Sequence, residues 1–329
     1  MDTKKQHGQF FTTGNPFRHP AFTLWATHFP SDSVILEPYA GANGLIAMLR
    51  EVGLAKRYSS FDIAPAEATV VLRDVIKDFP KDYKVCVTNP PYLAKNSATR
   101  SQTPIPPLEG YDNLWKLATV RCLENCDYVA AIIPESFITS GLFTDRLESV
   151  ISLNFKMFED TDQPVCLALW GPEKSSSYLI YKGDKSLGTN LSLEKKVNKL
   201  LPKVEPIKTS FNDVAGKIGL KAIDNTLSPS IQFIPSNEIA TKEIKVSSRH
   251  RTRIAIDSKI PADKIIARAN LLLNEYRVIT SDVFLTSFRG IREDGSFRRR
   301  LDWASAKRIL EVAISLESVA NHKDNNKGK

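Results

Sequence analysis

The chain has 329 residues, more than a single domain usually holds, so we expect two domains. Its 42% hydrophobic and 25% charged residues exclude a mainly disordered, collagen-like or coiled-coil protein. No apolar run approaches the ~18 residues that a membrane-spanning helix needs, and the N-terminal residues lack the apolar stretch of a secretory signal. We therefore expect a cytoplasmic protein without a membrane partner.

The net charge of +8 is unevenly distributed. Residues 1–180 carry 17 Lys and Arg against 20 Asp and Glu, whereas residues 181–329 carry 28 against 17. A near-neutral half beside a strongly basic half indicates chemistry in the first and binding of a polyanion by the second. A basic, well-solvated surface would have the same composition, so the charge by itself leaves both interpretations open.

The first half alternates strand and helix patterns, which predicts an α/β fold. Strands are expected at 33–41, 58–63, 68–74, 83–88, 128–134, 149–157, 164–170 and 178–183, and helices at 46–53 and from about 114 to 122. The run 128–134 is nearly all apolar, as in a strand buried on both faces of a parallel sheet. We predict a catalytic domain at 1–180, followed by a linker at 184–192.

The second half contains short mixed segments and then two amphipathic helices. The first follows Pro261 and places Ile265, Ala269 and Leu272 on one face, and the second begins at about Asp302. These features predict a helix-rich, basic domain over residues 181–320. The polar segment 321–329 has nothing to bury and is expected to be a disordered tail.

The four residues Asn89, Pro90, Pro91 and Tyr92 directly follow the predicted buried strand 83–88. The two prolines remove backbone donors and stiffen the chain, which leaves the Asn89 side chain and the Pro90 carbonyl as acceptors beside an aromatic ring. Two acceptors and a ring face suit a planar amino group. A rigid strand-to-loop turn is the structural alternative, but polar residues at the carboxyl ends of strands favour a binding site.

With four further segments in the same order, this tetrapeptide resembles the S-adenosylmethionine-dependent N6-adenine DNA methyltransferases. The resemblance covers about residues 8–170. GQFFTT (8–13) is similar to the N-terminal cofactor motif, with Thr13 where the family has proline. EPYAGANG (37–44) is similar to the glycine-rich first motif, with Asn43 in the place of a glycine. FDI (61–63) is similar to the acidic motif, and the segment at Phe158 to a late motif.

The resemblance implies a Rossmann-like methyltransferase sheet with S-adenosylmethionine as cofactor. Glu37 would hold the ammonium group, Asp62 the ribose hydroxyls, and Asp74 the adenine amine, with Asp78 as its rival. The cofactor-binding residues would be Phe11, Thr12, Glu37, Gly41, Gly44, Asp62, Ile63 and Asp74. The catalytic residues would be Asn89, Pro90 and Tyr92, and the rings of Tyr92 and Phe158 would stack on the target base.

The motif order adds an inference about the second half. The span 45–91 is too short for a recognition domain, so in this family that domain would follow the catalytic half, as in the gamma class. Two arginine-rich segments lie there, 247–253 and 287–300, the latter around an expected Asp294-Gly295 turn. The arginines expected to contact DNA are Arg249, Arg251, Arg289, Arg292, Arg298 and Arg300.

The resemblance thus implies a site-specific DNA adenine-N6 methyltransferase of a restriction–modification system, acting as a monomer or weak dimer on a flipped-out adenine of double-stranded DNA. An RNA adenine methyltransferase, a glutamine methyltransferase, a cytosine-N4 methyltransferase and a catalytically idle DNA-binding protein are the alternatives. No metal site is expected, because Cys122 and Cys126 lack partner ligands and the five histidines are scattered.

Overall fold

The computed structural model describes residues 14–158, 161–244 and 249–327, with side chains described up to residue 320. The chain divides into two compact units, Met1–Thr189 and Asn190–Lys329, slightly beyond the boundary at 180 that composition predicts. Each unit is described separately. None of the helices within the described ranges is long and apolar enough to cross a membrane.

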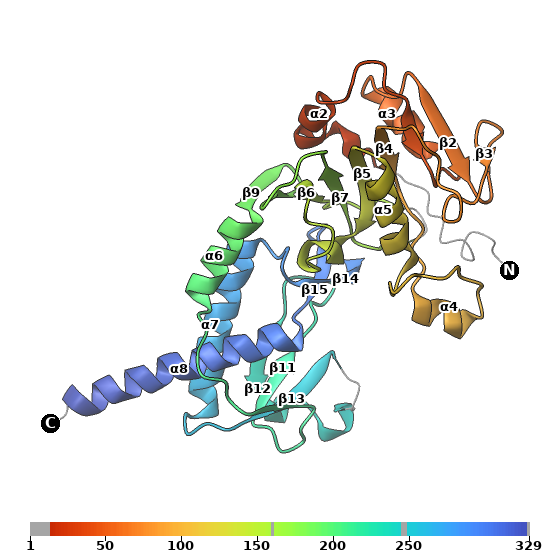
Figure 1. Cartoon of the computed structure of the whole chain (residues 1–329). Coiled ribbons are helices and arrows are strands. Elements are labelled where there is room, and N and C mark those ends of the chain that lie inside the picture. Colours follow the sequence, from red (N-terminus) through yellow and green to blue (C-terminus); the bar gives the residue numbers. More distant parts are fainter. Residues whose placement is uncertain (1–13, 159–160, 245–248, 328–329) are drawn as a thin grey trace. The chain divides into compact units, whose positions relative to one another are not determined.

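Within the described ranges, nine strands of the first unit form one mixed sheet (Figure 1) in the order β3-β2-β1-β4-β5-β7-β6-β8-β9. Their bounds are β1 Ile35–Glu37, β2 Tyr58–Asp62, β3 Val71–Leu72, β4 Val85–Thr88, β5 Tyr128–Pro134, β6 Leu147–Ser152, β7 Val165–Trp170, β8 Leu179–Lys182 and β9 Lys185–Thr189. The five strands β3, β2, β1, β4 and β5 are parallel to one another, whereas β7 runs antiparallel to β5 and β6.

The strand order reverses between β1 and β4. From β1 the chain continues outward to β2 and β3 on one side, and then returns to β4 and β5 on the other side. In open α/β sheets, the crevice outside the carboxyl ends of the strands at such a reversal is where ligands bind. The sheet therefore places its natural binding position at the ends of β1 and β4, which are the segments Glu37–Gly44 and Asn89–Tyr92.

Helices cover both faces of this sheet (Figure 1). On one face, α2 (Pro20–Ala26) and α3 (Gly44–Glu51) bury Phe22, Trp25 and Leu49 against apolar residues of β4 and β5. On the other face, α5 (Leu114–Asn125) packs against β5 and brings the thiol of Cys122 to that of Cys86. The short α4 (Lys95–Ser101) and the single turns η1 (Pro16–Arg18) and η2 (Glu135–Thr139) complete the unit.

The predicted linker at 184–192 is wrong. Residues Lys185–Thr189 form β9, which pairs antiparallel with β8, and α6 (Asn190–Leu200) starts directly after it. Strand β9 has few apolar side chains, and its residues are exposed or half-buried. It is held as an edge strand by backbone hydrogen bonds, which leave no hydrophobic pattern in the sequence.

The second unit contains both helices and strands, so a helix-rich description is incomplete. Strands β10 (Thr209–Phe211), β11 (Ile218–Lys221), β12 (Gln232–Pro235) and β13 (Arg251–Ile256) form an antiparallel sheet in the order β10-β13-β11-β12. The helices α6 and α8 (Trp303–Lys327) both pack against α7 (Ala262–Thr280). The core joins Phe233 and Ile254 of the sheet to Leu273 of α7 and Ile309 of α8.

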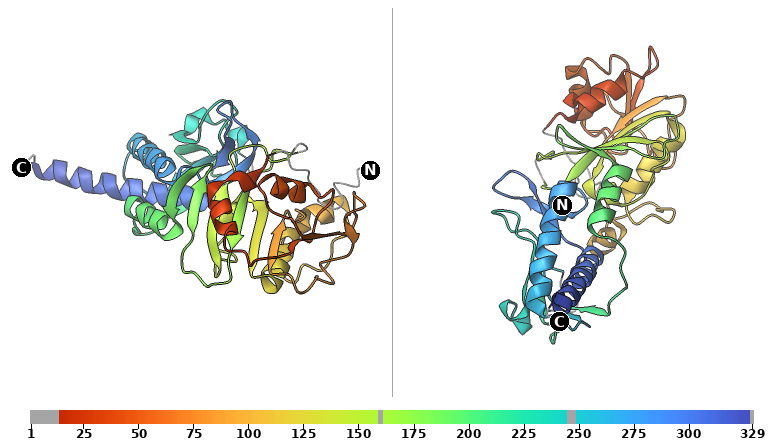
Figure 2. Two further views of the ribbon diagram at one scale, coloured as in Figure 1. Left: turned by 90° about the horizontal axis from the view of Figure 1, so that it is seen from above. Right: turned by 90° about the vertical axis from the view of Figure 1, so that its left-hand side faces the viewer.

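Two further features complete the second unit. A hairpin of β14 (Thr286–Ile291) and β15 (Phe297–Arg300) turns at Asp294-Gly295, as the sequence predicts, with Gly295 in the left-handed region at φ +77°. Figure 2 shows α8 as one continuous helix, and it extends to Lys327. Residues 321–327 are therefore helical where the sequence predicts the start of a disordered tail.

Candidate functional site

Three polar side chains end adjacent strands at the reversal of strand order. Glu37 ends β1, Asp62 ends β2, and Asn89 directly follows β4. Because β1 pairs in parallel with both β2 and β4, these three ends lie at the same edge of the sheet. The structure thereby brings together three residues that span more than fifty positions of the sequence.

Glu37 is fully buried, and its two carboxyl oxygens differ. Its Oε1 accepts hydrogen bonds from the Thr88 hydroxyl (2.9 Å) and the Tyr39 backbone N–H (3.1 Å). Its Oε2 is also buried and has no hydrogen-bond partner among the described residues. Desolvation by burial, reinforced by the charge of Asp62, raises the pKa of Glu37 to about 8 despite its two hydrogen bonds. A buried, unsatisfied oxygen at a strand end fits a cationic ligand.

The loop after β1 is held open by Asp62. Its two carboxylate oxygens accept the backbone N–H groups of Gly41 and Ala64, each at 2.8 Å. Gly41 has φ +53°, and no described atom lies within 4 Å of the position that a Cβ would occupy there. A ligand could therefore approach the backbone closely at this glycine. Asp62 therefore shapes this loop, in addition to its expected role toward ribose. The sequence does not predict these two hydrogen bonds.

Asn43 explains the departure from the family's glycine pattern. It has φ +61°, a left-handed conformation that asparagine tolerates better than most residues, and it caps α3 at Gly44. Its side chain accepts a hydrogen bond from Ser60 (2.6 Å) and donates one to Thr69 (3.2 Å). The asparagine thus replaces the glycine's conformation and also ties the loop to β2.

The remaining expected cofactor residues of β2 and β3 lie nearby in the chain. Ile63 follows β2 with 53% of its surface exposed, which suits packing against a ligand ring. Asp74 has a side chain 30% exposed and pairs with Lys77 at 3.0 Å, whereas Asp78 is 75% exposed and pairs with Arg73. The lower exposure favours Asp74 over Asp78 as a ligand contact. Phe11 and Thr12 lie outside the described residues.

The tetrapeptide after β4 is anchored by the hydroxyl of Tyr92. This hydroxyl lies 2.6 Å from the carbonyl of Ile132 in β5 and 2.7 Å from Oδ1 of Asn89, and its single hydrogen is shared between these two acceptors. Burial raises the pKa of the Tyr92 hydroxyl well above its usual value, so it remains a donor. Tyr92 as a whole residue is half-buried. Its position is therefore set from β5, with the Asn89 side chain attached to the same hydroxyl.

Phe158 requires a correction. It is fully buried in the core and meets the Tyr92 ring edge-on, with centroids 6.0 Å apart at 71°. A ring with no exposed surface offers no face to an incoming base, so in this conformation Phe158 supports Tyr92 from behind. The sequence shows an aromatic in the expected place but does not reveal its burial.

The two arginine-rich segments of the second unit are joined at the level of the backbone. His250, which precedes β13, accepts from the N–H of Ala222, and Ala222 accepts from the N–H of Leu301 after β15. The His250 ring also meets Phe288 of β14 edge-on at 5.7 Å. Segments about forty residues apart in sequence therefore form one continuous basic region.

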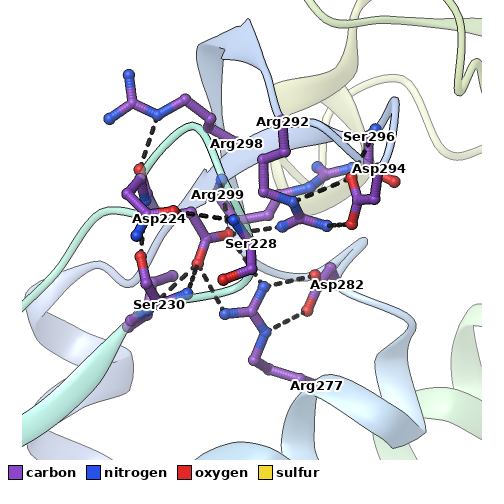
Figure 3. Close-up of polar contacts among 12 residues, drawn as sticks. Asp224, Ser228, Ser230, Arg277, Asp282, Arg292, Asp294, Ser296, Arg298 and Arg299 are labelled. Carbon is purple, nitrogen blue, oxygen red and sulfur yellow. Dashed lines mark hydrogen bonds and ion pairs between the residues drawn. The ribbon is translucent and has the colours of Figure 1, made fainter.

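The arginines of this region divide into two groups. No carboxylate pairs with Arg249, Arg289 or Arg300 in the part of the chain that the structure describes, and Arg249 and Arg289 are exposed. Arg298 lies over the Phe288 ring at 5.1 Å and bonds to a backbone carbonyl through Nε alone, and its terminal nitrogens point away from the neighbouring ion pairs (Figure 3). Arg251 is exposed but paired with Glu243 at 2.8 Å.

The other group surrounds Asp224, a fully buried residue that sequence reasoning misses (Figure 3). Its carboxylate accepts two hydrogen bonds from Arg277 at 3.0 Å and one from Arg292 at 2.8 Å. It also accepts the backbone N–H groups of Ser230 (2.7 Å) and Arg299 (3.2 Å). Burial would raise the pKa of Asp224, but the bonds from Arg277 and the backbone outweigh it and hold that pKa below its usual value.

The predicted DNA contact of Arg292 is therefore wrong. Its side chain is 4% exposed and bonds to the carboxylates of Asp224 and Asp294, so in this conformation it is not accessible to an external phosphate or base. Arg299 is likewise buried and bonds to Ser287. The arginines at 298 and 300, which alternate with Arg299 along β15, remain half-exposed.

The titration of Glu37 predicts a pH dependence of stability. Its pKa is raised from 4.5 to about 8 on folding, so the folded state retains a proton that the unfolded chain loses. The contribution of Glu37 to the free energy of unfolding should be largest below about pH 4.5 and should fall as pH rises to about 8, by on the order of 4 kcal/mol. Glu37→Gln should remove this fall. Urea unfolding at pH 5.5, 7 and 8.5 measures the difference, and parallel pH profiles for the two proteins would contradict the assignment.

A second prediction concerns Asp224. Asp224→Asn keeps the size of the side chain but removes the negative charge that pairs with the buried guanidinium groups of Arg277 and Arg292. This loss should lower the free energy of unfolding by roughly 3 kcal/mol. The matched control Asp257→Asn changes an exposed acid of the same unit and should stay within about 0.5 kcal/mol of the parent. Thermal and urea unfolding test both, and equal stabilities would show that the network contributes nothing net.

Comparisons with known proteins give distant similarities. No family model and no curated protein matches the chain. Similar solved structures include a modification subunit of a putative type I restriction enzyme from Vibrio vulnificus YJ016 (12% identity, TM-score 0.39, 55% of this chain and 48% of that one). A second is a type I restriction-modification methyltransferase subunit from Streptococcus thermophilus, with 14% identity, a TM-score of 0.39, and coverage of 58% of this chain and 53% of that one. A third is a putative class I S-adenosylmethionine-dependent methyltransferase from Listeria monocytogenes, with 13% identity, a TM-score of 0.37, and coverage of 50% of this chain and 62% of that one. The chain spans about half to three fifths of the length of these proteins.

Proposed function

We propose that this chain is an S-adenosylmethionine-dependent DNA methyltransferase that modifies the N6 amino group of adenine, as part of a restriction–modification system. The observation that carries the proposal is the meeting of Glu37, Asp62 and Asn89 at one reversal of strand order. The first two suit the two ends of the cofactor, and Asn89 with Pro90 and Tyr92 suits an amino group. One edge of the sheet thus carries residues suited to both reactants.

The residues at the end of β1 and β2 fit the cofactor. The unpartnered Oε2 of Glu37 suits the ammonium group, and the open Cβ position at Gly41 suits close approach of the ligand to the backbone. The Asp62 carboxylate would accept hydrogen bonds from the ribose hydroxyls, and the exposed side chain of Ile63 suits the adenine ring. Asp74 would accept the adenine amine. When bound, S-adenosylmethionine supplies an electrophilic methyl group.

The tetrapeptide would activate the target amine. Its lone pair is delocalised into the adenine ring, which makes it a poor nucleophile. Acceptance of its two hydrogens by Oδ1 of Asn89 and the carbonyl of Pro90 would draw the lone pair out of the ring plane and stabilise the developing positive charge. The Tyr92 ring, anchored to β5, would stack on the extruded base, with Phe158 behind it. Transfer to the nitrogen needs no covalent enzyme intermediate.

The second unit would hold the DNA. Arg249, Arg289 and Arg300, together with Arg298, form the basic region that we propose as the DNA-contacting face. Arg251 could contact DNA only if its ion pair with Glu243 broke. The proposed division is then chemistry at 1–180 and DNA recognition at 181–320. An RNA substrate would use the same tetrapeptide chemistry and is distinguished by assay.

Asn89→Ala should lower methyl transfer by about 10²–10³-fold, because one acceptor of the target amine is lost. Cofactor affinity should stay close to that of the parent, since Asn89 lies on the target side. Single-turnover transfer to duplex DNA, to single-stranded DNA and to RNA measures the effect and identifies the substrate. The control Asn96→Ala changes an exposed asparagine of α4 and should be fully active. Normal transfer by Asn89→Ala would remove the central claim.

Arg289→Ala and Arg300→Ala should each weaken DNA binding and lower the slope of log affinity against log salt by about one unit, as the loss of one phosphate contact requires. Lys259→Ala is the matched control, because Lys259 is exposed and precedes α7 at the end opposite Arg277, with about 22 Å of helix between Ala262 and Arg277. Binding titrations at several salt concentrations test the set. Unchanged slopes for both arginine variants would move the DNA face elsewhere.

A further inference from the structure

The surroundings of Glu37 do not suit an ionised carboxylate in the free protein. Its side chain is fully buried, and only one of its two oxygens is satisfied, by the Thr88 hydroxyl and the Tyr39 N–H. The other oxygen has no hydrogen-bond partner among the described residues. An ionised carboxylate with one bare, buried oxygen is costly, whereas a neutral carboxylic acid in the same place is much less so.

The groups that face Glu37 from the elements around it also disfavour its ionised form. Asp62 on β2 contributes a negative charge, and Cys122 on α5 and the Tyr39 hydroxyl are neutral acids near it. In the described part of the chain no Lys, Arg or His lies within ion-pair distance of Glu37. Burial is the main reason that its pKa lies at about 8, so the free protein carries the proton at neutral pH.

We propose that Glu37 takes up the ammonium group of the cofactor in exchange for its own proton, so that cofactor binding releases about one proton to solvent. This inference rests on the proposed function for the identity of the ligand. In the exchange the O–H bond of Glu37 breaks, the proton goes to buffer, and the resulting carboxylate pairs with the ammonium group. No other bond changes.

The exchange makes Glu37 a specificity-determining residue. Pairing with the ammonium group of a ligand offsets the free-energy cost of ionising the buried Glu37. An adenosine ligand without an ammonium group leaves the proton on Glu37. Affinity for the ammonium ligand should therefore rise about tenfold per pH unit from about pH 5.5 to 7.5, while affinity for the other ligand stays level. If the carboxylate were already ionised in the free protein, affinity for the ammonium ligand would not rise with pH over this range.

Isothermal titration calorimetry of the full chain at pH 6.5, in buffers of different ionisation enthalpy, tests the exchange. S-adenosylhomocysteine carries the ammonium group and should release about one proton. 5′-Methylthioadenosine keeps the adenosine and thioether but lacks the amino acid, and it should release none. The wild-type protein alone decides the outcome, so the test does not depend on a variant that folds.

Two variants refine the assignment. Glu37→Gln should bind S-adenosylhomocysteine without proton release, and its affinity deficit should shrink as pH falls. Glu135→Gln is the matched control, because Glu135 is a second buried acid at a strand end, after β5, held by the Ser152 hydroxyl. It should keep the proton release. Loss of release in Glu135→Gln but not in Glu37→Gln would overturn the assignment.

The failures are distinguishable. Tight binding of S-adenosylhomocysteine with no proton release, and with level affinity across pH 5.5–7.5, would overturn the exchange and leave the proposed function in place. Absence of binding at every pH would overturn the cofactor assignment, and the exchange with it.

Discussion

The reversal of strand order between β1 and β4 is the constraint on which the first unit depends. Because β1 is parallel to both of its neighbours, the chain must leave each strand at the same edge of the sheet. At the reversal, the connecting segments diverge to opposite sides and leave the strand ends uncovered. Glu37, Asp62 and Asn89 come to one edge for this reason, although no local sequence feature relates them.

Much of the first unit follows from its sequence. The apolar runs at 83–88 and 128–134 predict β4 and β5 because a strand buried on both faces must be apolar throughout. The segments 37–44 and 89–92 lie at the ends of β1 and β4, as the predicted strands require. Burial of individual residues does not follow: Phe158 has the expected residue type but no exposed surface, and β9 is an edge strand held by its backbone.

The second unit is harder to predict because identical residues serve opposite purposes. Arg292 and Arg289 lie three positions apart in one arginine-rich segment, but Arg292 is buried between two carboxylates and Arg289 is exposed. The difference depends on Asp224, which lies 68 residues before Arg292 and has no recognisable motif around it. Tertiary contacts of this range cannot be inferred from the composition of a segment, which indicates only that the region is basic.

The network around Asp224 also has a consequence for the order of folding. Its partners Arg277, Arg292 and Arg299 follow it by 53, 68 and 75 residues. Closing such long loops is slow and entropically costly. A chain that emerges from the ribosome therefore carries Asp224 without its full set of arginine partners until β15 has been synthesised. The hairpin, the loop at 224–231 and the end of α7 are expected to become ordered in a single late step.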